Sequence, residues 1–212
     1  MRRPYLGKES MSNVPDRHHR RSIRMPGYDY AQPGVYFVTV CTHQQELLFG
    51  EVVGEAMVLN DAGRIVETCW YETPDHFQSV ELDAFVIMPN HVHGIVMIVG
   101  ARHASPLQQT SVHAHGPKRG SVGAIVGSFS AVTRRINQMR ATPGTPVWQR
   151  NYWEHVIRSE WALTAIRQYI LDNPARWSHD RYNPVATGPD RRAAELWRLL
   201  LGEPDLRGSN SD

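Results

Sequence analysis

Residues 86–98 read VIMPNHVHGIVMI, and this stretch decides how the rest of the chain is interpreted. The apolar and β-branched residues on both sides of Pro89-Asn90 predict two strands, at 81–88 and 91–99, because such side chains pack well on a pleated sheet. Pro-Asn is a turn dipeptide, so it favours a reversal or a bulge between them.

Outward from this pair, strands and helices alternate along the chain. We predict a strand at 35–42, a hairpin at 47–59, a helix begun by Asn60 or Asp61 and closed by Pro74, and a helix begun by Ser121 whose distal, polar end carries Arg134, Arg135 and Arg140. A strand at 154–158, a helix from Ser159 to Asp172 and a last helix at 191–201 follow. The order βαββαβ is the ferredoxin-like split unit, an α+β antiparallel sheet with helices on one face. In that topology the strand at 91–99 lies in the sheet interior.

The composition predicts a globular protein with one main core. The chain has 212 residues, of which 41% are hydrophobic and 21% charged. We expect a domain at 28–178, a basic, flexible arm at 1–27 and a C-terminal extension at 179–212. There is no run of about 18 apolar residues that would cross a membrane, no secretory signal, and too few cysteines for a disulfide framework. We therefore expect a cytoplasmic, nucleoid-associated protein.

The net charge of +2 conceals two basic blocks. Residues 1–30 hold seven Lys/Arg against three acids, and residues 101–153 hold seven against none. Such blocks predict a polyanionic partner, although solvated basic loops would have the same composition. Trp148, Tyr152 and Trp153 lie among the arginines of the second block. Unpaired bases could stack on these aromatic rings, or the rings belong to the core. The candidate DNA-binding residues are Arg17, Arg20, Arg21, Arg24, Lys118, Arg119, Arg134, Arg135 and Arg150.

His91 and His93 are the first candidates for chemistry. On a strand, residues i and i+2 share a face, with Cα atoms roughly 6.6–6.8 Å apart, so two imidazoles can converge on one ion. Spacing alone is weak, since His113 and His115 repeat it in a Gly/Pro-containing loop. A satisfied polar pair is the alternative, but two histidines on an interior strand are costly to bury unless something binds them.

Tyr169 and Asn173 lie four residues apart on a predicted helix and therefore share a face. A tyrosine hydroxyl with free space suits nucleophilic attack on phosphorus, provided that its pKa of about 10 is offset by local activation. A metal ion helps by polarising the phosphate. A half-buried core tyrosine is the alternative interpretation.

Taken together, these segments resemble a known family. MPNHVHG at 88–94, EHVIRSE at 154–160 and QYILDNP at 168–174, in that order and with SVGAIVGSFSAVTRRIN at 121–137, resemble the HUH-type single-tyrosine transposases. The resemblance is greatest to the REP-associated tyrosine transposases, the branch with an IS200-like domain, and it covers about residues 20–177.

The resemblance implies an HUH endonuclease fold in which an extra C-terminal helix carries the tyrosine, and metal-dependent cleavage and joining of single-stranded DNA. His91 and His93 would ligate Mg²⁺ or Mn²⁺, with Asn173 as a third, amide-type ligand. Tyr169 would be the nucleophile, forming a 5′-phosphotyrosine and releasing a 3′-hydroxyl without a nucleotide cofactor. The implied partner is REP-like hairpin DNA, contacted by the arm and by the helix at 121–138, and the implied state is a monomer or a homodimer.

The chain also departs from the family. Ser130 stands where relatives often carry a lysine, and the His-rich segment 103–115 and the helix at 191–201 have no assigned role. A non-catalytic hairpin DNA- or RNA-binding protein on the same fold is the main alternative. A hydrolytic metalloenzyme ranks last, because it needs a carboxylate or histidine as third ligand and no HxxxH or HExxH motif is present.

Overall fold

The computed structural model describes residues 28–100, 118 and 120–202. Its main sheet has four antiparallel strands, β1 (Gly34–Cys41), β4 (Val80–Met88), β5 (His91–Ile98) and β6 (Trp153–Ile157), in the order β4-β5-β1-β6. This is the predicted ferredoxin-like order, and β5 lies in the sheet interior as expected. The arm at 1–27 and the segment 103–115 lie outside the described residues.

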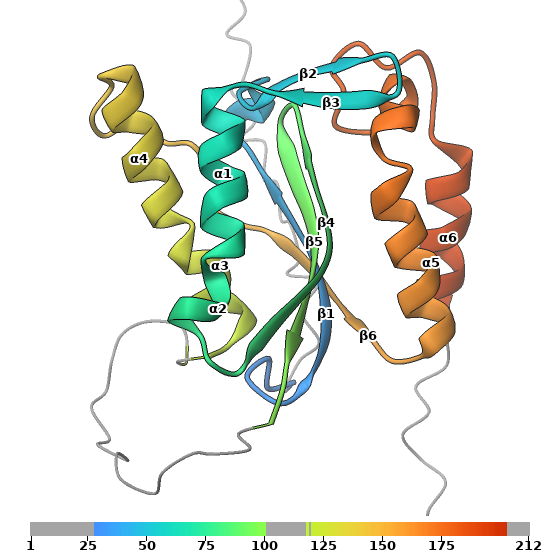
Figure 1. Cartoon of the computed structure of the whole chain (residues 1–212). Coiled ribbons are helices and arrows are strands. Elements are labelled where there is room, and N and C mark those ends of the chain that lie inside the picture. Colours follow the sequence, from blue (N-terminus) through green and yellow to red (C-terminus); the bar gives the residue numbers. More distant parts are fainter. Residues whose placement is uncertain (1–27, 101–117, 119, 203–212) are drawn as a thin grey trace, which may run out of the picture.

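Helices cover both faces of the sheet (Figure 1), so the prediction of helices on one face alone was wrong: α5 and α6 follow the βαββαβ unit and pack on its other face. On one face lie α1 (Asp61–Tyr71), α3 (Val122–Ser128) and α4 (Ser130–Arg140), and on the other lie α5 (Glu160–Leu171) and α6 (Arg191–Gly202). The shorter elements are α2 (Thr73–His76), the 3₁₀ turns η1 (His43–Gln45) and η2 (Pro174–His179), and the predicted hairpin, formed by β2 (Gly50–Val53) and β3 (Ala56–Leu59). In the described part of the chain, no helix is both long and apolar enough to span a membrane.

Three helices begin where the sequence predicts. The side chains of Asn60, Ser121 and Ser159 each accept a hydrogen bond from the backbone N–H three residues later. Each bond satisfies a donor that the first helical turn cannot pair internally.

Two helix boundaries differ from prediction. α1 ends at Tyr71, and Pro74 lies in the first turn of α2, where a proline leaves no hydrogen bond unmade. The single helix predicted to begin at Ser121 is divided into α3 and α4 at Phe129. There the Ser128 hydroxyl donates to the Ile125 carbonyl at 2.6 Å, which competes with regular helix hydrogen bonding.

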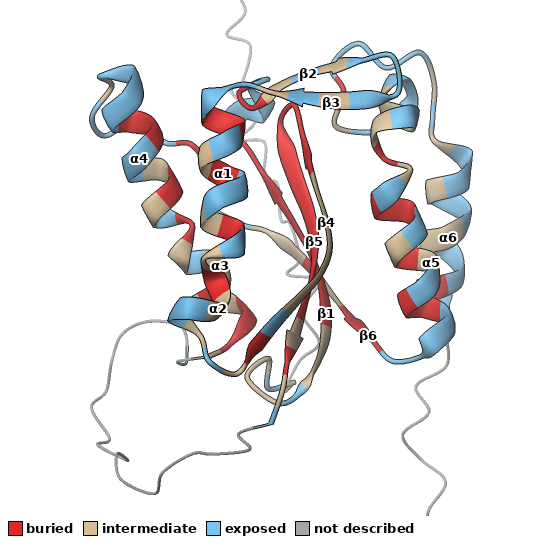
Figure 2. Cartoon of the chain, viewed as in Figure 1, coloured by how far each residue is buried: buried red, intermediate tan, exposed pale blue. Residues whose placement is uncertain are grey.

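The alternation of side chains along the strands creates two separate cores (Figure 2). In β1, Tyr36 and Val38 pack toward α1 and α4, whereas Phe37 packs toward α5. In β5, Val92 belongs to the first core. Because neighbours on a strand point to opposite faces, both predicted histidines lie on the α5 side.

Gly94 of β5 leaves the space that the Trp70 ring occupies. Trp70 is 1% exposed and stacks on Phe85, with 4.5 Å between ring centroids. A Cβ atom at Gly94 would lie 2.2 Å from Trp70 Cη2. The absence of a side chain at this position therefore sets how closely α1 approaches the sheet.

Replacing Gly94 by alanine is expected to destabilise the fold by about 1–3 kcal/mol, because the fully buried Trp70 ring must move. The free energy of unfolding from urea titration measures this cost. Gly127→Ala is the matched control: it lies in α3 with open space around it, so the alanine should stabilise by about 0.5–1 kcal/mol. Equal effects at both positions would contradict the packing account.

Candidate active site

β5 places His91 and His93 on the sheet face that α5 covers. Their register partners on β1 are Cys41 and Thr39. The two histidines are 0% and 2% exposed, and their ring centroids lie 4.5 Å apart. Two imidazoles are thus side by side in the protein interior, and each ring nitrogen must find a partner.

Asn90 determines which nitrogen of His91 carries the proton. The Asn90 side-chain N–H groups donate to the carbonyls of Gln45 at 3.2 Å and Tyr182 at 2.7 Å, so its oxygen faces His91 Nδ1, at 2.9 Å. A carbonyl oxygen only accepts, so Nδ1 is the donor and Nε2 of the neutral ring has a bare lone pair. Burial holds the pKa of His91 well below its usual value, which keeps the ring neutral.

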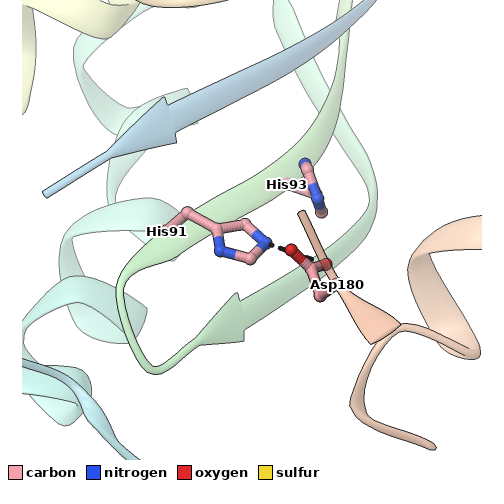
Figure 3. Close-up of side chains that lie close together, drawn as sticks. All are labelled: His91, His93 and Asp180. Atoms are coloured by element: carbon pink, nitrogen blue, oxygen red, sulfur yellow. Dashed lines mark ion pairs between the residues drawn. The ribbon is translucent and has the colours of Figure 1, made fainter. Parts of the chain in front are cut away.

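Asp180 lies opposite this lone pair (Figure 3). Its Oδ2 is 3.9 Å from His91 Nε2, and Nε2 has no hydrogen-bond partner among the described residues. Burial raises the pKa of Asp180 to about 6, so the carboxylate is ionised at neutral pH. Lone pairs therefore face each other across a buried gap, an arrangement that a cation stabilises and that is costly without one.

A divalent metal ion fits this set of donors. One ligand atom from each of His91, His93 and Asp180 lies within 4.8 Å of the others. Imidazole nitrogens with a carboxylate suit first-row metals such as Mn²⁺, with water or substrate oxygens completing the shell.

The sequence analysis missed Asp180, because no ligand spacing connects it to the histidines. It follows η2 in an irregular turn, where its Oδ1 accepts from the Tyr182 N–H at 2.7 Å and its N–H donates to the Trp177 carbonyl at 3.1 Å. These bonds fix the direction of the carboxylate. Tertiary folding alone brings this turn to β5.

α5 is fixed on the sheet so that Tyr169 faces β5. Ile166 and Ile170 are fully buried, and Arg167 Nε donates to Asp83 Oδ1 at 2.9 Å, which ties the helix to β4. The hydrogen bond to Arg167 lowers the pKa of Asp83, so this pair is charged at neutral pH.

The Tyr169 hydroxyl lies 3.3 Å from His93 Nε2, within the same chain. On the other side of the ring, His93 Nδ1 is 2.8 Å from Thr39 Oγ1. Burial lowers the pKa of His93 to about 3, so this imidazole is also neutral. The predicted phenol and the predicted histidine pair therefore meet at one place.

The Tyr169 ring is held between aromatic and cationic groups. Phe37 and Trp197 lie with ring centroids 6.1 and 5.7 Å away, and the Arg176 guanidinium lies 5.0 Å from the ring centroid. Burial raises the pKa of Tyr169, while the charge of Arg176 opposes this effect. The phenol is protonated at neutral pH and would need activation before it attacks a substrate.

Asn173 lies one turn after Tyr169 and is 2% exposed. Its Oδ1 has no hydrogen-bond partner among the described residues, and its side chain acts to lower the Tyr169 pKa. The amide is thus beside the phenol. Its role as a metal ligand stays a prediction, and Asp180 is the oxygen donor grouped with the two histidines.

Residues beyond 178, predicted as an extension, form part of this site. Trp197 of α6 contacts the Tyr169 ring, and the Arg176 guanidinium both donates to the Tyr169 carbonyl at 3.0 Å and pairs with Asp190 at 3.4 Å. A cavity of about 1020 Å³ lies here, with His93, Tyr169 and Asp180 in its lining together with residues of β1, β6 and α6. This volume is at the upper end for ligand pockets.

Within the described part of the chain, the predicted basic residues do not line the cavity. Arg134 and Arg135 lie on α4, across the sheet from α5 (Figure 1), and Arg135 pairs with Glu72 at 2.9 Å. Lys118 pairs with Asp29 at 2.7 Å, and Arg150 is exposed. The remaining candidates, Arg17, Arg20, Arg21, Arg24 and Arg119, lie outside the described residues.

The aromatic residues between these arginines belong largely to the core. The Trp148 indole donates to the Phe129 carbonyl at 3.2 Å and packs on Phe49. Trp153 packs on Phe37 and Trp197, on the α5 side. Tyr152 and Trp153 also line the cavity beside Tyr169, whereas Arg134 and Arg135 of α4 do not, so among the described residues these aromatics are separated from the α4 arginines.

Comparisons with known proteins find one clear relative by sequence. A protein of Haemophilus influenzae, described as an uncharacterized protein, is 41% identical over 170 residues, which cover 77% of this chain and 93% of that protein. No protein-family model matches the chain.

Two solved structures are similar at lower levels. One, described as a REP-associated tyrosine transposase bound to a REP hairpin, is 15% identical with a TM-score of 0.45, covering 73% of this chain and 74% of that one. The other, a candidate transposase from Deinococcus radiodurans, is 18% identical with a TM-score of 0.39, covering 70% and 95%. At these values neither likeness bears on the activity of this chain.

Asp180→Asn is expected to stabilise the metal-free protein and to abolish its response to Mn²⁺. The folded-state pKa of about 6 lies above the ordinary 3.8, so the ionised carboxylate costs stability at high pH and none below both values. The gain in the variant should reach roughly 2–3 kcal/mol at pH 8 and disappear as the pH falls from 6 toward 4.

Urea unfolding across this pH range, and the shift of Tm on adding Mn²⁺, measure both effects. Asp172→Asn, in the same region of the chain, should change neither. A metal-free variant less stable than the parent at pH 8 would show that the two lone pairs do not oppose each other.

Proposed function

This chain belongs to the same protein family as its Haemophilus influenzae relative, and we propose that it is a metal-dependent single-strand DNA endonuclease and strand transferase. In this proposal it acts on hairpin DNA of the REP type through a 5′-phosphotyrosine intermediate, as the resemblance of its motifs to the REP-associated tyrosine transposases implies.

One observation carries the proposal: a phenol and a buried cluster suited to a cation share one cavity in one chain. Tyr169 Oη lies 3.3 Å from His93 Nε2, while His91 and Asp180 direct lone pairs at each other at 3.9 Å. The two alternatives from the sequence fit less well. A tyrosine that only fills the core would not need an imidazole at its hydroxyl, and a histidine pair with all its hydrogen bonds made would not leave His91 Nε2 without a donor.

In the proposed reaction, the Tyr169 oxygen attacks phosphorus of a DNA phosphodiester. The new Oη–P bond forms as the P–O3′ bond breaks, the phenol loses its proton and the leaving 3′ oxygen gains one. The 5′ phosphate stays on the protein, so the energy of the phosphodiester is retained and rejoining needs no nucleotide cofactor. A bound Mg²⁺ or Mn²⁺ held by His91, His93 and Asp180 would polarise the phosphate and offset its developing charge.

The chain's own residues provide the position of the nucleophile. Arg176 bonds the Tyr169 carbonyl and lies over its ring, and Trp197 closes another side. A phenol held this way loses little further conformational entropy when the substrate binds. Such prior ordering is a large part of how a preorganised site lowers the reaction barrier. The exposed Arg134 and Arg150 are candidates for contacts to the paired stem.

A second candidate, a metal-dependent hydrolase that uses water as its nucleophile, is favoured by one observation. Such an enzyme needs a carboxylate or a third histidine beside the pair, and Asp180 is such a carboxylate. Tyr169 distinguishes the two proposals, because only the transferase requires its oxygen to form a bond.

Incubation with a labelled hairpin oligonucleotide and Mn²⁺ is expected to give a protein–DNA adduct that survives denaturant, and Tyr169→Phe is expected to give none. Denaturing gel electrophoresis measures the adduct, and mass spectrometry of tryptic peptides locates it. Tyr182→Phe is the matched control, since it removes a second phenol from the same cavity and should keep the adduct.

Two other outcomes would each indicate a different function for this protein. Cleavage that persists in Tyr169→Phe without an adduct would identify the hydrolase. Hairpin binding with no scission under any divalent ion would identify the non-catalytic binding protein.

A further inference from the structure

The cavity beside Tyr169 is poorly suited to a phosphate unless a cation is supplied. Three carboxylates line it, those of Glu154, Asp180 and Asp190. Asp190 is paired with Arg176, whereas the buried Asp180 carboxylate faces the His91 ring and would repel an incoming phosphodiester. Among the described lining residues, Arg181 is the one with a permanent positive charge.

Arg181 is placed at the solvent edge of this cavity. Its side chain is exposed although the residue lines the cavity, and no ion pair to it forms within the described part of the chain. Its guanidinium lies 5.1 Å from the centroid of the Tyr182 ring. The same ring lies 4.7 Å from the His91 ring, so Arg181 is one aromatic ring away from the histidine pair.

The backbone that carries Arg181 is held rigidly. The Asp180 carboxylate accepts from the Tyr182 N–H at 2.7 Å, the Tyr182 carbonyl accepts from Asn90 at 2.7 Å, and the Asn183 N–H donates to the Asp180 carbonyl at 3.0 Å. The turn that directs Asp180 inward therefore leaves Arg181 at the edge, and ordering its backbone on binding costs little.

We propose that Arg181 binds a backbone phosphate of single-stranded DNA at the edge of the Tyr169 cavity, and so holds the strand for attack. The proposal rests on the proposed function and adds a substrate-binding residue that the two basic blocks of the sequence do not include. A guanidinium suits the task because its planar fork of N–H donors matches two phosphate oxygens. The aromatic contact with Tyr182 orients it without neutralising its charge.

Fluorescence anisotropy with a labelled 12-nucleotide oligo-dT tests the proposal, in the Tyr169→Phe background so that no covalent step interferes. With Mn²⁺ present, Arg181→Ala is expected to weaken binding about tenfold, because the substitution removes one charged hydrogen-bonding group. The slope of log Kd against log salt should fall by about 0.7, the value for one phosphate contact on a single strand. Arg181→Lys should keep the slope and recover part of the affinity.

Two controls make the result specific. Arg192→Ala removes an exposed arginine at the start of α6, away from the cavity lining, and should leave affinity and slope unchanged. The second control is an oligo-dT with a neutral methylphosphonate backbone. Arg181→Ala should bind this oligonucleotide as tightly as the protein that retains Arg181 does, because there is no phosphate charge to contact.

The outcomes separate this inference from the function on which it rests. Unchanged affinity and slope in Arg181→Ala, with adduct formation by the parent intact, would overturn the role of Arg181 alone. A parent that neither binds the oligonucleotide nor forms an adduct would overturn both. Equal losses on the charged and the neutral backbone would show that Arg181 acts through folding, and a thermal melt of the variant would confirm it.

Discussion

The region around Tyr169 and the two histidines depends on one constraint: a bare imidazole lone pair faces a carboxylate in the protein interior. Asn90 imposes it, because its amide donates to two carbonyls and so leaves only an acceptor for His91 Nδ1. His91 Nε2 is then directed at Asp180, 3.9 Å away. In a medium of low dielectric two acceptors repel each other unless a cation lies between them. The fold therefore maintains a buried cluster that a bound cation would stabilise.

Side chains alternate between the two faces of the sheet, so one face packs an apolar core and the other carries the two histidines. On the α1 side, Val92 and the Trp70 ring that fills the space at Gly94 belong to an apolar core. On the α5 side, the same strand carries both histidines, and α5 and the segment leading to α6 cover them. Because β5 is paired on both edges, the backbone positions of both histidines are fixed by the strand register. This rigidity suits chemistry that needs groups held within a fraction of an ångström.

The segment beyond η2 is part of the site, although it follows the region of family resemblance. It supplies Asp180 to the histidine pair, Trp197 to the Tyr169 ring and Asp190 to Arg176. Residues on both sides of position 178 therefore contact the candidate site. In the proposed function, metal binding and Arg181 would together reverse the negative local charge that a phosphodiester meets in this cavity.

Local sequence alone determined the strand pair around Pro89-Asn90, the caps at Asn60, Ser121 and Ser159, the βαββαβ order, and the shared faces of His91 with His93 and of Tyr169 with Asn173. These features depend on periodicity and on residues within a few positions, which is why pattern reasoning reaches them. Tertiary structure decided the rest: the meeting of Tyr169 with His93, the arrival of Asp180, the division of the helix at Phe129, and the separation of the α4 arginines from the cavity. Each of these depends on side-chain packing between segments far apart in the chain, and no local pattern encodes such a distance.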